Sequence, residues 1–478
     1  MFALTWMSRN DPFFWDTVQL GSKHAHHFFS NGLQWQPLPT LIDSGHPPVF
    51  GYYLAVIWTV FGKTLFVSHF AMLPFLWLSV WLLSKIGCRL AGNAWGMWLP
   101  LLVLIDPVLL GQSVMMSPDL VLAVSFLLAL EGILGQRKWL IAFGVFGLCA
   151  ISMRGMMTAA ALLTWTGLLP FLKDFDFRKL LFRCLPFLPG FAFAAGFLLW
   201  HFCTTGWLGY HKDSPWSGAF QGVGLAGFFK NVAVIAWRWL DFGRVGELFI
   251  LAGLFYRKFQ HRADAEQQTR KEYPMLPLLI CLLVFLLPSA LLYQNLSAHR
   301  YFLPAFIACH LLVFQWIMGQ SLKQSLGNTA AGLTTKNGAK TSEGIKSYLL
   351  IGLIGCLALG NCWVYPRGIS MDWDSTLAHR PYHRLRAEAL GFLETQGIDF
   401  AKVGSAFPNL NTGENLLLNG DQRQFSKLNF AQNEYVFSSN VFNDISGADY
   451  SLLEKEWNLI WRKRRAGVWI EIYGRKGF

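Results

Sequence analysis

Long apolar stretches recur along most of the chain, and they constrain the fold more than any other feature. Ten of them are long enough to cross about 30 Å of hydrocarbon, at residues 65–87, 93–112, 118–135, 138–154, 155–172, 181–203, 242–257, 274–294, 300–319 and 347–364. Hydrophobic residues fill 53% of the 478 positions and charged residues only 14%, whereas soluble proteins carry about 25% charged residues. The sequence therefore predicts a mainly α-helical, polytopic transmembrane protein with about ten spans.

The loops between these stretches alternate in charge. One set is rich in Lys and Arg, whereas the other set, around 113–117, 204–241 and 295–299, is poor in them for its length. Because basic loops stay in the cytoplasm, we expect the second set and both ends of the chain on the opposite side. The net charge of +12 comes mainly from the basic loops, which argues against a nucleic-acid partner. The basic loops hold Lys85 and Arg89; Arg137 and Lys138; Lys173, Arg178, Lys179 and Arg183; Arg257, Lys258, Arg262, Arg270 and Lys271; and Lys323, Lys336, Lys340 and Lys346.

The N-terminal segment raises two questions of topology. The apolar run Pro47–Gly62 is short for a span, and a crossing there would reverse the Lys/Arg bias of every later loop. We therefore expect a helix that lies in the membrane interface and is opened by Pro47-Pro48. No signal-peptide pattern is visible at the recorded start, and Met1–Trp6 looks like the tail of a membrane helix. We expect a first span to precede it.

After residue 364 the composition changes, and a small α/β domain is predicted outside the membrane. Residues 380–396 have the apolar spacing of a helix that ends at Gly397. Strand-like runs follow at 402–407 and 435–442, and a last pair at 457–462 and 467–473 is joined by a tight basic turn. The predicted organisation is an outer loop at 1–64, a helical membrane domain at 65–364 and an extracytoplasmic domain at 365–478.

Polar residues concentrate in the N-terminal segment. A carboxyl group near apolar surroundings can have its pKa raised and act as a general base, although composition alone favours an ordinary hydrated loop. The histidines could bind a metal, but the spacing in HAHH places no two of them four residues apart. The sequence permits a divalent metal without requiring one, and it calls for no other cofactor. The residues concerned are Asp11, Asp16, Asp43, His24, His26, His27 and His46.

Four more charged residues lie at or near the ends of predicted spans. Asp119 begins a helix, where an acid also complements the helix dipole. Asp106 lies within an apolar stretch, and an acid inside a membrane is a functional candidate because it is costly. Arg154 lies at a break between spans and Arg300 at the outer end of one. Arg grasps phosphate through parallel hydrogen bonds, although either side chain can instead anchor its helix at the interface.

These features together resemble the lipid-phosphosugar-dependent glycosyltransferases of the protein O-mannosyltransferase and aminoarabinose transferase superfamily, which is glycosyltransferase family 39-like and has the GT-C fold. The resemblance covers most of residues 10–310, and its motifs are SGHPPVFGYYLAVIWTVFG, SPDLVLAVSFLLAL and HRYFLPAF. An acid-bearing first outer loop and a basic residue at the 153–155 break also match. The sequence departs from the family where the usual Asp-Glu pair is Asp16-Thr17, where Ser68-His69 stands in place of an Arg, and where Lys-Gly is Arg154-Gly155.

The resemblance implies roles for six residues. Asp16 would be the catalytic base, with Asp11 in reserve, and Asp119 would line the same cavity. The implied reaction is an inverting displacement of a sugar from polyprenyl phosphate, in which Asp16 takes the proton of the acceptor hydroxyl. Basic residues would offset the charge that grows on the departing phosphate. The implied carrier-phosphate contacts are His46, Arg300 and Arg154.

The resemblance also implies a setting for this reaction. The donor would be a polyprenyl-phosphate-linked sugar, and the acceptor a lipid, a glycan or a protein. The protein would lie among the lipids of the inner (plasma) membrane, with its C-terminal domain on the periplasmic side and no nucleic-acid partner. A transporter or lipid flippase is the main alternative, but we find no clear internal repeat or paired broken helices. A non-catalytic membrane scaffold would leave the charged residues unexplained.

Overall fold

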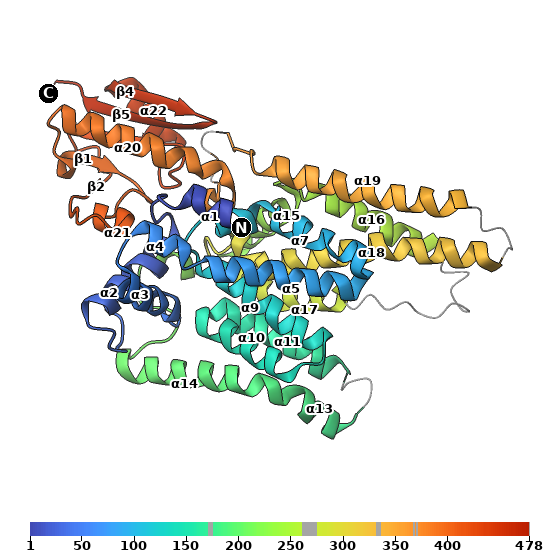
Figure 1. The fold of residues 1–478 in the computed structure, drawn as a ribbon. Coiled ribbons are helices and arrows are strands. Elements are labelled where there is room, and N and C mark those ends of the chain that lie inside the picture. The colour runs from blue at the N-terminus through green and yellow to red at the C-terminus, as the bar shows by residue number, and fades with distance from the viewer. Residues whose placement is uncertain (171–174, 261–274, 331–335, 367–368, 370, 478) are drawn as a thin grey trace.

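The computed structural model describes residues 1–170, 175–260, 275–330, 336–366, 369 and 371–477. Helices run side by side in an elongated bundle, and a small sheet with its own helices sits at one end (Figure 1). The N-terminal helices lie at the same end as the sheet (Figure 1). The mainly α-helical fold with a small C-terminal α/β part is confirmed.

The predicted apolar stretches fall mainly on helices wherever the structure describes them, and residues 171, 172 and 274 of these stretches lie outside the described residues. By length and composition, five helices among the described residues could each cross a membrane, or six if one bent pair counts as a single span. The location of the apolar stretches is thus confirmed, whereas the count of ten is not. In chain order the helices are α5 (Leu73–Ala91), α6 (Asn93–Gly96), α7 (Trp98–Leu104), α8 (Pro107–Ser113), α9 (Pro118–Leu134), α10 (Lys138–Ile151), α11 (Met153–Leu163), η2 (Thr164–Leu168), α13 (Phe177–Cys184), η3 (Leu185–Phe187), α14 (Leu188–Thr205), α15 (Leu225–Leu240), α16 (Val245–Gln260), α17 (Met275–Leu292), η5 (His299–Phe302), α18 (Leu303–Ala330) and α19 (Lys336–Gly360).

The bent pair corrects the prediction of one continuous span at 93–112. The axis turns by 74° between the helices that end at Leu104 and begin at Pro107. Asp106 caps the second helix, because its Oδ1 accepts hydrogen bonds from the backbone N–H groups of Val108 and Leu109. Proline has no N–H to continue the first helix and suits the first turn of the next. The break therefore follows from the Asp-Pro pair.

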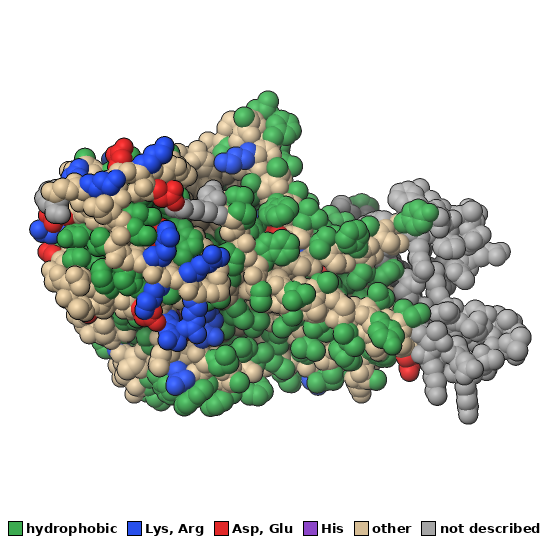
Figure 2. Space-filling model, turned by 90° about the horizontal axis from the view of Figure 1, so that it is seen from above, with side chains coloured by type: hydrophobic (Ala, Val, Ile, Leu, Met, Phe, Trp, Pro, Cys, Tyr) green, Lys and Arg blue, Asp and Glu red, His purple; other side chains and the backbone are tan. Residues whose placement is uncertain are grey.

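The surface of the bundle suits a lipid environment. Charged side chains gather at the sheet end of the molecule, while the visible flank of the bundle is largely hydrophobic (Figure 2). Large apolar side chains point outward along it, among them Phe249 and Leu359, each 73% exposed. Such a band is typical of a membrane protein, in which helices satisfy their own backbone hydrogen bonds.

The N-terminal segment folds into short helices that pack together beside the sheet. They are α1 (Phe2–Ser8), η1 (Val18–Lys23), α2 (His24–Ser30), α3 (Val49–Phe61) and α4 (Leu65–Phe70). Helix α3 lies on α2 so closely that a Cβ on Gly51 would stand 2.3 Å from His24 Cβ. Just past its end, Lys63 pairs with Glu414 of the sheet region. The run at 47–62 thus forms the helix Val49–Phe61, which lies beside the N-terminal elements (Figure 1).

The predicted outer loop at 204–241 contains a helix that the sequence did not indicate. Helix α15 fills the second half of this loop, and it packs near the end of α17 and the start of η5. Asn231 donates to the carbonyls of Leu291 and Tyr293, while Asp241, just after the helix, faces His299. Lys230 and Arg238 interrupt its apolar pattern, which explains why the sequence read as a loop.

The C-terminal sheet has five strands in the order β2-β1-β3-β5-β4. Strand β1 is parallel to β2 and β3, whereas β5 is antiparallel to β3 and β4. Buried side chains of α20, including Leu385, Ala389 and Leu393, pack against the sheet. The predicted helix and strands are confirmed within a few residues. The elements are η6 (Trp373–Ser375), η7 (Leu377–His379), α20 (Arg380–Thr395), η8 (Phe400–Lys402), β1 (Val403–Ser405), α21 (Gly413–Leu417), β2 (Ser426–Lys427), β3 (Tyr435–Ser439), α22 (Gly447–Glu456), β4 (Trp457–Arg465) and β5 (Val468–Arg475).

Candidate functional site

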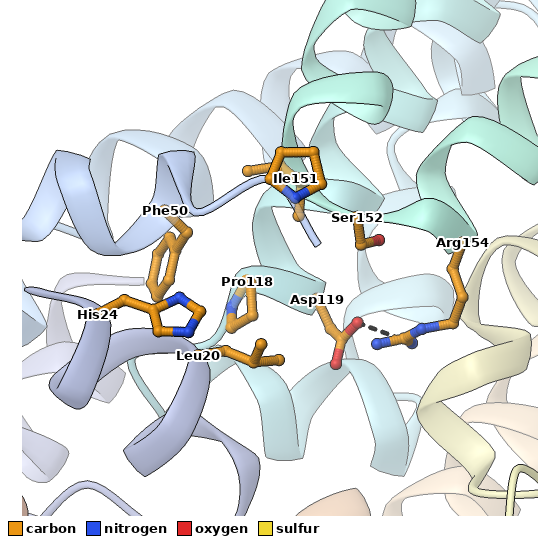
Figure 3. A pocket seen from close by; sticks show the side chains of 9 residues that line it. Leu20, His24, Phe50, Pro118, Asp119, Ile151, Ser152 and Arg154 are labelled. Carbon is orange, nitrogen blue, oxygen red and sulfur yellow. Dashed lines mark ion pairs between the residues drawn. The ribbon is translucent and has the colours of Figure 1, made fainter. Parts of the chain in front are cut away.

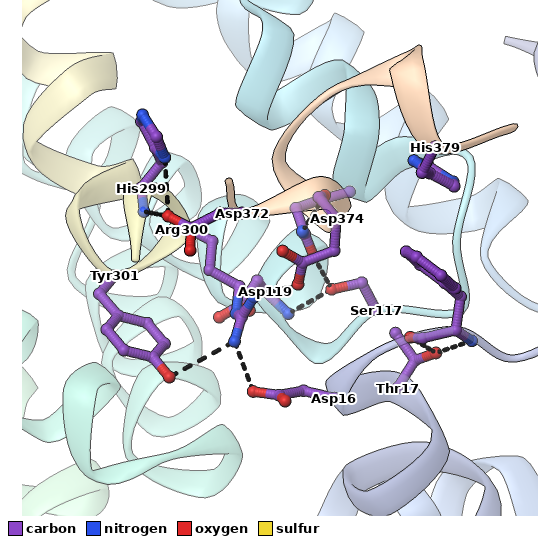
Figure 4. A network of polar contacts seen from close by, with 12 residues as sticks. Asp16, Thr17, Ser117, Asp119, His299, Arg300, Tyr301, Asp372, Asp374 and His379 are labelled. Atoms are coloured by element: carbon purple, nitrogen blue, oxygen red, sulfur yellow. Dashed lines mark hydrogen bonds and ion pairs between the residues drawn. The ribbon is translucent and has the colours of Figure 1, made fainter. Parts of the chain in front are cut away.

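Arg300 lies at the centre of a charged cluster at the sheet end of the bundle (Figure 4). Its side chain is only 4% exposed, and three carboxylates surround it. Nη2 donates to Asp16 Oδ2 at 2.5 Å, Nη1 pairs with Asp374 Oδ2, and Nε lies 3.5 Å from Asp119 Oδ2. We call Asp16, Asp119, Arg154, Arg300 and Asp374 the Arg300 cluster.

Local turns place the two N-proximal acids of the cluster. A tight turn comes just before η1: Thr17 Oγ1 accepts from Phe14 N at 2.9 Å and donates to Phe14 O at 2.7 Å. Trp15 within this turn has a φ of +56°, in the left-handed region. The turn presents Asp16 to Arg300. Asp119 lies in the first turn of α9, whose N-cap Ser117 accepts from Asp119 N at 3.1 Å.

Arg154 approaches the same acids from α11. Its Nη1 lies 3.0 Å from Asp119 Oδ1, and its guanidinium stands over the Tyr301 ring, 4.2 Å from the ring centroid. The sharp entry to α11 needs the following glycine, because a Cβ on Gly155 would stand 1.9 Å from the carbonyl oxygen of Leu148. Asp119 is thus flanked by two guanidinium groups, those of Arg154 and Arg300.

Two further acids come from the segment that follows α19, and the sequence did not single them out. Asp374 contacts Arg300, while Asp372 Oδ2 lies 2.8 Å from His299 Nδ1. The other ring nitrogen of His299, Nε2, lies 2.8 Å from Asp241 Oδ1. Each ring nitrogen of His299 thus faces a carboxylate. In the sequence, the two acids of Asp372-Trp373-Asp374 soon after the last predicted span could have indicated them.

The balance of charge in the cluster depends on Asp374. Burial raises the pKa of Asp374 to about 8, and Asp16, Asp372 and Asp119 add to the rise, while Arg300 opposes it. Its Oδ1 is buried and has no hydrogen-bond partner in the described part of the chain, which disfavours the ionised form. With Asp374 protonated at neutral pH, the two remaining carboxylates balance the two guanidinium groups.

A small pocket opens beside the cluster (Figure 3). Asp119, Ser152 and Arg154 form one side of it, and Leu20, His24 and Phe50 are among the others that line it. The side chain of Arg154 is 17% exposed, so it can meet a ligand there.

His46 lies close to this pocket and contributes no charge to it. Burial lowers its pKa to about 3, and the charge of Arg154 adds to the fall, so His46 is neutral. Its Nδ1 is buried without a hydrogen-bond partner among the residues that the structure describes.

The remaining candidates have partners outside the cluster. Asp11 pairs with Arg380 Nε at 3.0 Å, and burial raises its pKa despite this pair. Asp43 Oδ2 lies 2.9 Å from His201 Nε2, and both side chains are 3% exposed. These two acids anchor the N-terminal segment to α20 and to α14.

The three clustered histidines of HAHH also point to different partners. His24 Nε2 lies 2.8 Å from the carbonyl oxygen of Ile42, and His26 Nε2 lies 2.9 Å from Glu414 Oε1. His27 Nε2 lies 3.3 Å from the amide nitrogen of Gln36. Within the described ranges, no three His, Cys, Asp or Glu side chains are grouped so that they could hold a metal.

A second, deeper layer of charge continues from His299 into the bundle. Arg244, 1% exposed, lies 3.8 Å from Asp241 Oδ1 and 2.9 Å from Asp106 Oδ2. Asp106 also lies 3.2 Å from His310 Nε2, and His310 Nδ1 pairs with Glu247. We call Asp106, Asp241, Arg244, Glu247 and His310 the inner layer.

Comparisons with known proteins identify the fold. No protein-family profile matches the sequence, and no curated protein does either. The crystal structure of ArnT from Cupriavidus metallidurans in the apo state matches over 98% of this chain and 96% of that chain, with a TM-score of 0.51 and 12% identity. The crystal structure of the same protein bound to undecaprenyl phosphate has a TM-score of 0.49 with the same identity and coverage. The chain thus has the fold of ArnT, and the GT-C fold that the sequence resembles is confirmed.

Proposed function

We propose that this protein is a membrane glycosyltransferase that moves a sugar from a polyprenyl-phosphate carrier to an acceptor at the membrane surface. The observation that supports it best is the convergence of Asp16, Asp119, Arg154 and Arg300 beside one pocket. A base for a hydroxyl and cations for a phosphate are what such a transfer needs. The shared fold with ArnT, a protein that has been crystallised with undecaprenyl phosphate, agrees with this proposal.

In the proposed reaction Asp16 is the general base. Its side chain is 17% exposed, and Arg300 contacts its Oδ2, which orients the carboxylate. Asp16 takes the proton of the acceptor hydroxyl as that oxygen bonds to the anomeric carbon. The bond from the anomeric carbon to the carrier phosphate oxygen breaks, and the configuration inverts. Asp11 is held by Arg380 outside the cluster, so it is the weaker candidate.

The departing phosphate would meet positive charge from Arg154, which lines the pocket. Arg300 would contribute by exchanging part of its contact with a carboxylate for a phosphate oxygen. Neutral His46, with its free Nδ1, would serve as a hydrogen-bonding group and not as a cation. Removing one charge-compensating donor of this kind costs a factor of about 100 to 1,000 in rate.

The proposed side for this chemistry is the periplasmic one. The N-terminal segment and the sheet lie at one end of the bundle (Figure 1), and the basic residues Lys85 and Arg89 close α5 at the other end. Because basic loops stay inside, the Arg300 cluster would face outward at the inner membrane. The acceptor would be a lipid, a glycan or a protein that reaches this surface.

The experiment is a transfer assay with the purified protein in liposomes that contain a radiolabelled polyprenyl-phosphate sugar and extracted envelope lipids. We expect labelled product with the wild type and with Asp11→Asn, and none with Asp16→Asn, although the latter still inserts. Solute flux without sugar transfer would refute the enzyme and favour a transporter. Near-normal transfer by Asp16→Asn would move the base to Asp119.

A further inference from the structure

A second pocket lies in the C-terminal domain, and its most unusual feature is a buried guanidinium. Arg386 on α20 is only 7% exposed and lines a small pocket. Its Nε donates to Asn409 Oδ1 at 2.6 Å. Its guanidinium also contacts the Tyr382 hydroxyl, which is neutral, and among the described residues no carboxylate lies within ion-pair distance of it. Arg is almost never buried so deeply unless it is paired.

The nearest acid does not neutralise this charge. Asp421 lines the same pocket, but its two oxygens are taken by Arg423, with Nε–Oδ1 at 3.0 Å and Nη2–Oδ2 at 2.8 Å. The Tyr382 hydroxyl beside Arg386 does not neutralise it either, because burial raises the pKa of Tyr382 despite the nearby guanidinium. The pocket thus keeps one uncompensated positive charge, and an unpaired buried charge is costly.

The rest of the lining limits what can supply the missing negative charge. Leu390, Phe400, Leu417 and Phe425 give the pocket apolar walls. The carboxylate of Asp421 would repel a doubly charged phosphate more than a single negative charge. A planar carboxylate fits the fork of a guanidinium through two parallel hydrogen bonds. A small monocarboxylate with an apolar part fits the apolar walls, carries a single negative charge and matches the guanidinium fork.

We propose that the pocket at Arg386 binds the carboxylate group of a small molecule. The site shares no lining residue with the pocket beside the Arg300 cluster, so it does not depend on the proposed transfer reaction. One wall of it, α21, is nevertheless bonded to the segment that carries Asp16. Phe13 N donates to Leu416 O at 2.9 Å, and Ser22 Oγ donates to Asn415 O at 2.7 Å. In Figure 1, α21 lies on the side of the sheet that faces the N-terminal helices.

The test is a ¹⁹F NMR titration of the purified full chain with trifluoroacetate at constant ionic strength. We expect saturable binding with a dissociation constant in the range of about 1–10 mM. Arg386→Gln should weaken it at least about tenfold, and Leu390→Trp, which fills the pocket and keeps the charge, should abolish it. Arg384→Gln on the same helix is the control, because that side chain is 67% exposed; it should bind as the wild type does.

Three outcomes would overturn the proposal. The first is a wild type without saturable binding, and the second is Arg386→Gln with unchanged affinity. The third is displacement of trifluoroacetate by inorganic phosphate as readily as by acetate, since this contradicts the monoanion argument. If Arg386→Gln does not fold, Leu390→Trp decides alone, because unchanged binding there places the anion elsewhere.

Discussion

Asp374 should set the alkaline limit of the transfer reaction. Burial raises its pKa from 3.8 to about 8, so the group is neutral at pH 7 and ionises above pH 8. Ionisation would leave three carboxylates facing Arg154 and Arg300 and would weaken the attraction for the carrier phosphate. We expect kcat/KM for the carrier-linked sugar to fall about tenfold per pH unit above this pKa. Asp374→Asn keeps the shape and removes the titration, so its profile should stay flat through pH 9.

The same group makes stability depend on pH. Between pH 4 and 8 the folded state keeps a proton on Asp374 that the unfolded chain has lost. The free energy of unfolding should therefore decrease as the pH rises, by about 1.4 kcal/mol per pH unit and on the order of 5 kcal/mol in all. Thermal unfolding from pH 5 to 9 measures this slope, which Asp374→Asn should remove.

Two results would refute this reasoning. A wild-type activity profile without a fall near pH 8 would show that Asp374 is already ionised at neutral pH. An alkaline fall that persists in Asp374→Asn would assign the titration to another group. Asp11→Asn is the matched control, because that acid pairs with Arg380 away from the cluster and should leave the alkaline limb unchanged.

Other substitutions test the Arg300 cluster and the inner layer. Arg300→Gln leaves Asp16 and Asp119 without this cation, so stability should fall by about 3–5 kcal/mol and transfer by at least about a hundredfold; unfolding and transfer assays measure both. Adding Asp16→Asn should recover part of that stability, and a loss that is simply additive would contradict the pairing. Arg244→Met should destabilise by a similar amount, because it leaves Asp106 buried and unpaired. The double variant Arg244→Met/Asp106→Asn should recover stability in thermal unfolding.

Much of the fold could be predicted because a membrane makes spans visible in sequence. A helix that satisfies its own backbone hydrogen bonds in lipid must be apolar over a fixed length, and the described parts of the predicted stretches are mainly helical. The same rule fails where polar residues interrupt a helix, as in α15 with Lys230 and Arg238. It also does not predict the break at Asp106, because that break arises where Asp106 caps a new helix inside an apolar stretch.

Only part of the candidate site could be predicted from the sequence, for a related reason. Asp16, Asp119, Arg154 and Arg300 were all chosen from the sequence, and the structure brings them together. Asp374 is 74 residues from Arg300 along the chain, so no local spacing rule could pair them. Residues near in sequence obey helix or strand periodicity, whereas this contact depends on how the segment after α19 returns across the end of the bundle.

The Arg300 cluster and the inner layer differ in side-chain exposure, and this difference decides which residues a ligand can reach. In the Arg300 cluster, Asp16 and Arg154 are each 17% exposed, so they can exchange partners with a substrate. In the inner layer, Asp106 and Arg244 are each 1% exposed and are already paired. A buried pair of this kind gives little net stability against an apolar alternative but fixes one arrangement of the helices. Asp106 was a functional candidate because it lies inside an apolar stretch. Its contacts instead indicate a structural role, since it caps the helix after the break and pairs with Arg244. We therefore assign the proposed chemistry to the Arg300 cluster and a structural role to the inner layer.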